Sequence, residues 1–294
     1  LMDARSIAAT ALCGGAITPA DEIEYEVPEY EYHFDNSPYL RRVYYGFGKP
    51  QPETPLILGP NISDWPEQHE LGEHLLVELA AVIHDEVTTA DELIPSGETS
   101  SYRSNPRRLA EFTLSRRVPD YVPRAKASAA LEAERRAGKK PEALMSVLRL
   151  VGDAEKLIET TQFGSAIYAT RPGDGSAREQ AASCQKVLGG LANICVEYAT
   201  KRYRSNCINW GILPFRIASG ERFDCEPGDY VFVPNIRALI ASGKTEFPAK
   251  VIRTDQRVYD IKLFVDPLTD DERQILLDGC LMNYYKNQKS SLKM

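Results

Sequence analysis

The chain has 294 residues, of which 43% are hydrophobic and 26% are charged, and its formal net charge is −7 at pH 7. This length and apolar content predict a globular protein with a substantial core, in one large domain or two ordinary ones. The acidic balance argues against a protein whose main task is to hold a polyanion. No apolar run approaches the roughly 20 residues that a membrane span needs, so no membrane partner is expected.

The six cysteines, at positions 13, 184, 195, 207, 225 and 280, form no CxxC pair. Their spacing matches neither a zinc ribbon nor a dense disulfide framework, so a reducing cytoplasm is the expected location. The first residues also lack the basic start, apolar run and cleavage site of a secretory signal.

The N-terminal part divides into a helix and a linker. Residues 3–12 show apolar residues at helical spacing and precede a Gly-Gly pair, which predicts a short helix with a glycine stop. Residues 22–34 alternate acidic and aromatic residues, and a stretch rich in proline and asparagine continues to residue 55. Because this composition cannot bury itself, an extended linker is expected.

The rest of the chain alternates between strand and helix patterns. Residues 56–60 and 78–87 fit strands, although Leu75, Leu79 and Ile83 also fit a helical stripe. Helices are expected at 128–136, 141–152 and 177–188. Further strands are expected at 163–170, 229–235, 249–255 and 258–266, the last three in a sheet with one solvent-exposed face. A capping box at Thr269 predicts a final helix that runs to residue 285. The fold class is therefore mixed α/β.

Residues 173–181 read GDGSAREQA and follow the predicted strand at 163–170. A glycine-rich turn before a helix collects anions, because the first backbone amides of the helix lack internal partners and the helix dipole is positive there. Arg178 adds a planar group that can bind a carboxylate through two hydrogen bonds. The structural alternative is that Ser176 and Glu179 form only a Ser-x-x-Glu capping box.

Three segments, in the same order along the chain, resemble aconitase-family hydro-lyases. GDGSAREQA is similar to the family's G-E/D-G-S-S-R-E-H-A turn, and VTTADELIPSG at 87–97 to its T-T-D-x-I-x-x-x-G loop. KRYRSNCINWGILPF at 201–215 is similar to its R-I-H-x-S-N-L…G-x-L-P segment. The resemblance covers roughly residues 55–290. It implies the family's C-terminal swivelling domain, a three-layer β/β/α unit, at 55–294, preceded by a linker at 25–54 and the tail of another domain at 1–24.

The resemblance also implies roles for five residues. Ser176 matches the catalytic serine, which as an alkoxide removes the proton alpha to a substrate carboxylate. Arg178 and Arg103 match arginines that bind substrate carboxylate, and Asp91, twelve residues before Arg103, matches the aspartate of the T-T-D loop and is grouped with Ser176 as catalytic. The amide of Ala177 is expected to help to hold an oxyanion. A serine can act as this base only in a buried, strongly basic corner, because such a corner lowers its pKa.

The sequence departs from the family pattern at four positions. Ala177 replaces the second serine, Glu92 replaces the histidine after the aspartate, Gln180 replaces the histidine of R-E-H-A, and Ala90 is inserted before Asp91. These changes concern the identity of the substrate, expected to be a di- or tricarboxylate, more than the type of reaction.

The resemblance implies a 4Fe–4S cluster that three cysteines hold, two of them as CxxC. No cysteine of this chain falls at a position that matches a cluster ligand, so no metal ligand is predicted here and the cysteines are expected to be small buried residues. The cluster-bearing domains would lie before residue 1. The chain is then expected to be the C-terminal part of a longer hydratase, inactive alone.

Other interpretations remain open. The same basic turn would serve a binding module that holds a carboxylate or RNA without turnover, or the chain could be a structural subunit whose site has decayed. The KRYR stretch at 201–204 is too short for a nucleic-acid footprint, so Arg202 and Arg204 are expected at the substrate entrance. His69 and His74, five residues apart, would point about 140° apart on a helix, which disfavours a zinc site. Trp210 is expected in the core.

Overall fold

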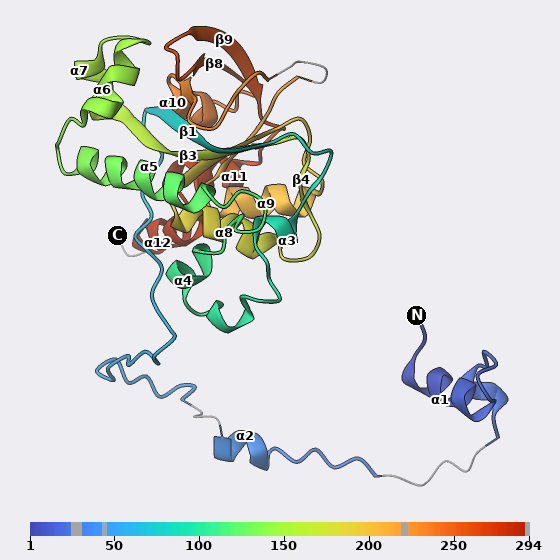
Figure 1. The fold of residues 1–294 in the computed structure, drawn as a ribbon. Coiled ribbons are helices and arrows are strands. Elements are labelled where there is room, and N and C mark those ends of the chain that lie inside the picture. The colour runs from blue at the N-terminus through green and yellow to red at the C-terminus, as the bar shows by residue number, and fades with distance from the viewer. Residues whose placement is uncertain (25–30, 43–45, 219–222, 292–294) are drawn as a thin grey trace. The chain divides into compact units, whose positions relative to one another are not determined.

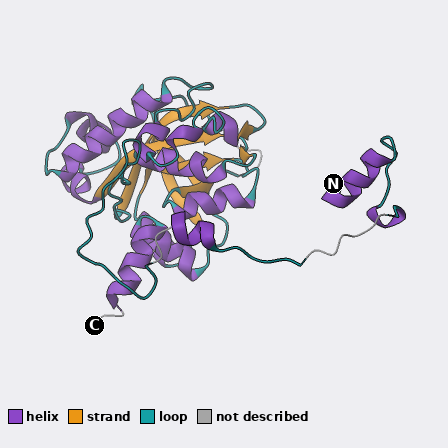
Figure 2. Cartoon of the chain, turned by 90° about the horizontal axis from the view of Figure 1, so that it is seen from below, coloured by secondary structure: helices purple, strands orange, loops and turns teal. Residues whose placement is uncertain are grey.

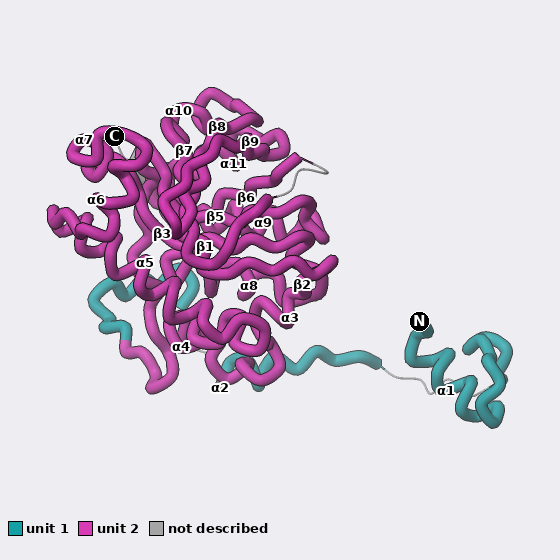
Figure 3. The backbone as a smooth tube through the Cα atoms, turned by 45° about the horizontal axis from the view of Figure 1, so that its top comes forward, with its two compact units in different colours: residues 1–56 teal, residues 57–294 magenta. Residues whose placement is uncertain are grey.

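The computed structural model describes residues 1–24, 31–42, 46–218 and 223–291. The chain forms two compact units, Leu1–Leu56 and Ile57–Met294, which Figure 3 shows in different colours. Within the expected linker, residues 25–30 and 43–45 lie outside the described residues. No helix of the described part combines the length and the apolar character that are needed to cross a bilayer.

The described residues of the first unit form three short helical segments: α1 (Ala4–Leu12), η1 (Ala20–Glu22) and α2 (Ser37–Arg42). The predicted N-terminal helix is confirmed as α1. It begins at Asp3, whose side chain accepts hydrogen bonds from the backbone N–H groups of Arg5 and Ser6, and it ends before the Gly-Gly pair. The expected extended linker is not extended throughout, because α2 lies within it.

The second unit is built around a closed sheet of seven strands. In order around the sheet they are β1 (His74–Ile83), β3 (Thr161–Ala169), β5 (Gly190–Cys195), β6 (Leu213–Arg216), β9 (Val258–Phe264), β8 (Glu246–Ile252) and β7 (Tyr230–Val233). The pairs β1–β3, β3–β5 and β5–β6 are parallel. The pairs β6–β9, β9–β8, β8–β7 and β7–β1 are antiparallel. A separate parallel pair joins β2 (Thr88–Thr89) to β4 (Pro172–Asp174).

Helices pack around this sheet, some of them over its parallel half (Figures 1 and 2). In chain order they are α3 (Ala90–Leu93), η2 (Ser100–Tyr102), α4 (Pro106–Ala110), α5 (Tyr121–Arg136), α6 (Glu142–Arg149), α7 (Ala154–Thr160), α8 (Arg178–Val187), α9 (Lys201–Asn209), α10 (Ile236–Ala241), α11 (Asp270–Asp278) and α12 (Leu281–Ser291). In Figure 1, α5, α8 and α9 lie on one side of β1 and β3, and β8 and β9 lie on the other.

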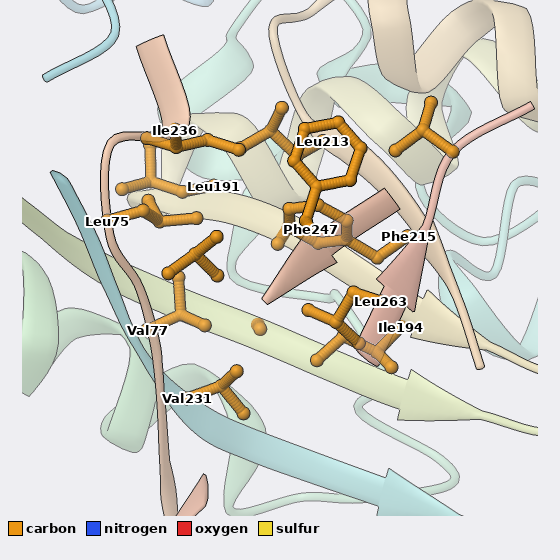
Figure 4. Close-up of a cluster of buried hydrophobic side chains, with 14 of the residues drawn as sticks. Leu75, Val77, Leu191, Ile194, Leu213, Phe215, Val231, Ile236, Phe247 and Leu263 are labelled. Carbon is orange, nitrogen blue, oxygen red and sulfur yellow. The ribbon is translucent and has the colours of Figure 1, made fainter. Parts of the chain in front are cut away.

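The described residues form three apolar clusters, of which the first two separate three layers and the third packs α6 and α7 against the sheet. The first fills the space between the parallel and antiparallel halves of the sheet, where Val77 and Ile194 face Val231 and Leu263 (Figure 4). The second lies between the parallel half and the helices, and includes Ile167 and residues of α3, α4, α8 and α9. The predicted β/β/α layering is therefore confirmed. That the sheet closes on itself was not predicted.

The structure shows why three sequence patterns gave an ambiguous or a wrong prediction of secondary structure. In the ambiguous segment at 78–87, residues 78–83 belong to strand β1, whose two faces are both buried, so they show a continuous apolar run rather than alternation, and residues 84–87 are irregular. The expected strand at 56–60 is wrong, since this segment is irregular and Leu56 and Ile57 are exposed. The expected single C-terminal helix is also wrong: Gly279, with φ of 88°, ends α11 and the chain restarts as α12.

The cysteines differ in accessibility. Cys13 is exposed, which corrects the expectation that all are buried, and the other five are buried. Burial raises the pKa of the Cys184 and Cys207 thiols to about 12. Because the thiolate is the reactive form, a thiol-specific reagent at pH 7.5 is expected to modify one cysteine per native chain and all six in denaturant. Mass spectrometry checks the site. Rapid labelling of Cys184 or Cys207 in the native protein would contradict this fold.

Candidate functional site

The glycine-rich turn and the T-T-A-D segment lie against each other. Strands β2 and β4 pair in parallel, with Thr88 opposite Pro172 and Thr89 opposite Asp174. A methyl group added at Gly175 would lie 3.3 Å from the Cβ of Ala90. The structure thus brings the segment before Asp91 next to the turn before Ser176, although 85 residues separate the two in sequence.

Gly173 is required by close packing beneath the turn. Its φ is 93°, and a Cβ at this position would lie 2.2 Å from the ring of Tyr203. Thr200, the N-terminal cap of α9, also fixes Gly173. Its hydroxyl donates a hydrogen bond to the Gly173 carbonyl at 3.1 Å and accepts one from the Tyr203 N–H. The turn therefore rests directly on the first turn of α9.

The hydroxyl of Tyr203 is held in a buried polar network. Its oxygen accepts from the side-chain amides of Gln185, at 2.8 Å, and Asn193, at 3.0 Å. All three side chains are buried, and burial raises the pKa of Tyr203 well above its ordinary value. This network connects α9 to α8 and β5, so the floor of the turn is fixed by three elements.

Ser176 is not a helix cap. Helix α8 begins at Arg178, the cap position is Ala177, and no side chain accepts a hydrogen bond there. The capping-box interpretation is wrong because Glu179 instead accepts from the indole N–H of Trp210 at 2.9 Å. Ser176 is exposed and forms no hydrogen bond with any described residue.

Arg178 is the cation nearest in sequence to Ser176, and it has no counter-charge. Its guanidinium forms no ion pair with the described residues, and its Nε is buried without a hydrogen-bond partner. The first amides of α8, unlike those of α3, α4 and α9, receive no side-chain cap. Free amides, the positive end of the dipole and an unpaired guanidinium together form a site suited to a carboxylate.

Asp91 is partly engaged by other groups. Its carboxylate accepts from the Ser96 N–H at 3.2 Å and lies 3.4 Å from the Nη1 of Arg116. Glu92, which replaces the family's histidine, has a structural role, because its side chain and that of Thr89 form the capping box of α3.

No hydrogen bond or ion pair recorded among the described residues joins Arg103 to the turn. Arg103 is exposed, ends η2, and forms no ion pair within the described ranges. It lies three residues before α4, which packs against α8.

Two expectations about the 201–215 segment are corrected. Arg204 does not line an entrance: only 15% of its side chain is exposed, and it lies 3.8 Å from the carboxylates of Asp266 and Glu272. It therefore links α9 to the start of α11. Trp210 is only partly buried: it packs against the edge of the second core and contacts Trp65, with ring centroids 4.5 Å apart and the rings tilted by 39°.

The expected buried, basic corner is not formed by this chain's described residues. Asp174, Gly175 and Ser176 are all exposed. The turn is thus an open half-site with a basic floor at Arg178. A dry environment for Ser176 requires a second surface.

The donor groups of this chain do not fit an iron–sulfur cluster. Of the cysteines, all but Cys13 are buried in the cores, and no three His, Cys, Asp or Glu residues of the described part are placed to hold a metal ion. A cluster needs several thiolates at close quarters. The described residues therefore supply no ligand set for such a cluster.

Lys186 is a buried cation that the sequence patterns did not single out. It lies near the C-terminal end of α8, is 6% exposed, and has one hydrogen bond, to the Gly211 carbonyl at 3.3 Å. Its position four residues after the buried Ala182 puts a lysine on the apolar face of a helix, which is the signal that could have found it.

A pH-dependent stability is expected from Lys186. Burial lowers its pKa from 10.5 to about 8. The folded chain therefore bears the full penalty below pH 8, and the penalty falls as pH rises above 8 and is lost once pH exceeds 10.5, the pKa of the unfolded chain. Lys186→Met should raise the free energy of unfolding by about 2 kcal/mol at pH 7, after loss of one hydrogen bond, and by little near pH 10.5.

Denaturant unfolding of both proteins at pH 7, 9 and 10.5 measures this effect. Lys244→Met, at an exposed position, is the matched control and should change stability little at any pH. A gain from Lys186→Met that does not vary with pH would refute the assignment.

Among solved structures, the chain is similar to a dehydratase. A crystal structure of 3-isopropylmalate dehydratase (leuD) from Methanocaldococcus jannaschii aligns with 75% of this chain and 98% of its own, at 21% identity and a TM-score of 0.43. No protein-family model matches the sequence, and no curated protein matches it. A likeness at this level does not determine the function, which depends on this chain's own residues.

Proposed function

We propose that this chain is the carboxylate-binding part of an aconitase-type hydro-lyase, which interconverts a hydroxy-carboxylic acid and its unsaturated partner. One observation carries the proposal: Ser176 precedes an uncapped helix start at which Arg178 has no counter-charge and a buried, unpartnered Nε. A solvated arginine would need no partner, but a buried N–H without one indicates a missing acceptor. A substrate carboxylate supplies two acceptor oxygens of the right geometry.

In the proposed reaction, Ser176 acts in its alkoxide form. It takes the proton from the carbon alpha to a carboxylate, and the electron pair of the broken C–H bond moves onto that carboxylate, which becomes a dianionic aci-acid. Arg178, Arg103 and the amide of Ala177 stabilise this charge as it grows. The electron pair of the aci-acid then forms the C=C bond as the hydroxyl leaves the neighbouring carbon. That hydroxyl takes a proton from an acid that the cluster-bearing domain would supply, and becomes water. Asp91, which lies beside the turn, is also proposed to be a catalytic residue.

The exposure of Ser176 fits a cleft that another part of the protein completes. We propose that residues 1–24 are the tail of a cluster-bearing domain, that 25–54 are a linker, and that the 4Fe–4S cluster lies on that other domain. The described residues of this chain offer the cluster no ligands, so the chain's own contribution is the serine, the arginines and the helix start. This chain alone is expected to bind carboxylate weakly and to be inactive.

The test uses the complete protein with its cluster reconstituted under anaerobic conditions. Citrate and 3-isopropylmalate are the two probes, and formation of the unsaturated acid is followed by its ultraviolet absorbance. Turnover that Ser176→Ala abolishes would support the proposal. RNA gel shifts without turnover would favour a regulatory binding module, and turnover that Ser176→Ala leaves intact would overturn the role of this serine.

A further inference from the structure

A cavity lies at the C-terminal end of α8, the opposite end from Ser176. Its volume is about 750 Å³, within the range of sites for small organic ligands. Its walls come from α5, from the start of β3, from residues 66–69 and from the C-terminal end of α8. Arg178 and Lys186 are eight residues apart on α8, which places the two regions about 12 Å apart along the helix axis.

Three cations line this cavity: Lys186, Arg136 and Arg107. Lys186 is almost fully buried and has one hydrogen-bond acceptor for its three N–H groups. Arg107 is exposed and forms no ion pair within the described ranges. A buried ammonium group without an anionic partner destabilises the folded protein. The positive charge of this wall is therefore unbalanced unless an anion binds there.

Glu132, the less exposed of the two acids in this wall, cannot supply the negative charge that Lys186 lacks. Glu132 is already shared: one carboxylate oxygen accepts from Arg135 at 2.8 Å and from Arg136 at 3.0 Å, and the other from Arg135 at 2.6 Å and from the Phe163 N–H at 3.1 Å. The remaining acid of the lining, Glu67, is exposed to solvent. The ammonium of Lys186 therefore has no carboxylate of the protein within ion-pair distance in the described part of the chain.

Part of the remaining lining is apolar, although Gln68, His69 and Gln162 also line the cavity. Ala129 and Ala133 on α5 and Phe163 on β3 form a wall beside the cations. This combination of a buried cation and hydrocarbon surface matches a ligand with an acid group at one end and an alkyl part at the other. An inorganic anion would leave most of the volume unfilled.

We propose that this cavity binds a small organic acid, whose carboxylate pairs with Lys186 and Arg136 and whose alkyl part lies against Ala129, Ala133 and Phe163. The site is separate from the turn at Ser176 and does not depend on the function proposed for that turn.

Calorimetric titration of the whole chain with sodium hexanoate tests the site. Saturable binding of one hexanoate per chain is expected. Lys186→Met should weaken it at least tenfold, and Ala133→Phe, which fills the cavity from an exposed helix position without altering charge, should abolish it. Lys244→Met and Ser176→Ala are the matched controls and should bind hexanoate as the unmodified chain does.

Four outcomes would overturn the proposal. They are the absence of saturable binding, equal binding of hexan-1-ol, binding of inorganic phosphate but not hexanoate, and loss of hexanoate binding in Ser176→Ala. The first denies a site, the second shows that Lys186 has no role, and the third shows that the ligand is not an organic acid. The fourth places the ligand at the glycine-rich turn. Far-ultraviolet circular dichroism confirms that each variant is folded.

Discussion

Gly173→Ala is expected to lower the free energy of unfolding of the second unit by about 3–5 kcal/mol. Two effects add. An alanine at φ of 93° is strained, and its methyl carbon would lie 2.2 Å from the ring of Tyr203. The ring cannot move aside freely, because its hydroxyl is fixed by Gln185 and Asn193. In a unit of this size the melting temperature should fall by roughly 10 °C.

Gly138→Ala is the matched control for backbone strain. Gly138 also has a positive φ, of 79°, but nothing lies within 4 Å of an added Cβ. Its substitution should cost about 1–2 kcal/mol, the strain alone. A double-mutant cycle with Tyr203→Leu separates the clash from the strain: the double variant should be more stable than the sum of the two single changes predicts. Equal losses in Gly173→Ala and Gly138→Ala would show that Tyr203 does not confine the turn.

Ser176→Ala is expected to reduce kcat of the complete enzyme by roughly 10²–10⁴-fold, with little change in KM. The hydroxyl is proposed to act only as the proton acceptor, so its loss removes a transition-state interaction and leaves carboxylate binding intact. Because Ser176 is exposed, caps no helix and forms no hydrogen bond with a described residue, its replacement should not change the melting temperature. A large loss of activity without a loss of stability is therefore the diagnostic result.

Two further variants complete this test: one is a control, and the other alters the arginine that is proposed to bind carboxylate. Ser146→Ala, at an exposed position on α6, is the matched control and should keep full activity. Arg178→Lys retains the charge but loses the planar pair of donors, so it should raise KM more than it lowers kcat. If Ser176→Ala changes KM and not kcat, the serine binds substrate and another group is the base.

Much of the fold could be predicted from local patterns. The helix at 3–12 and the start of α11 at Thr269 follow from capping residues that act within one turn of chain. The strand patterns at 249–255 and 258–266 belong to β8 and β9, whose outer faces are exposed, so their side chains alternate in the sequence. Strand β1 gave no such pattern, because the antiparallel half of the sheet covers one face and the helices cover the other.

The candidate site, like the fold, has features that local sequence patterns predict and features that they do not. The residues of the turn, its glycines and its position before a helix could be predicted, because each depends on neighbours in the sequence. The pairing of β2 with β4, the contact of Ala90 with Gly175 and the support from Tyr203 could not be predicted from local pattern, because they join segments far apart in the chain.

The sequence by itself determined the elements with local signals: capped helix starts, glycine stops, alternating strands and a turn rich in glycine. Only the tertiary structure decided that the sheet closes, that Ser176 is exposed rather than buried, that Glu179 binds Trp210 instead of capping, and that Lys186 is enclosed without an acid. The reason is physical. Capping and turn formation depend on groups a few residues apart, whereas burial and charge pairing depend on which distant segments cover a side chain.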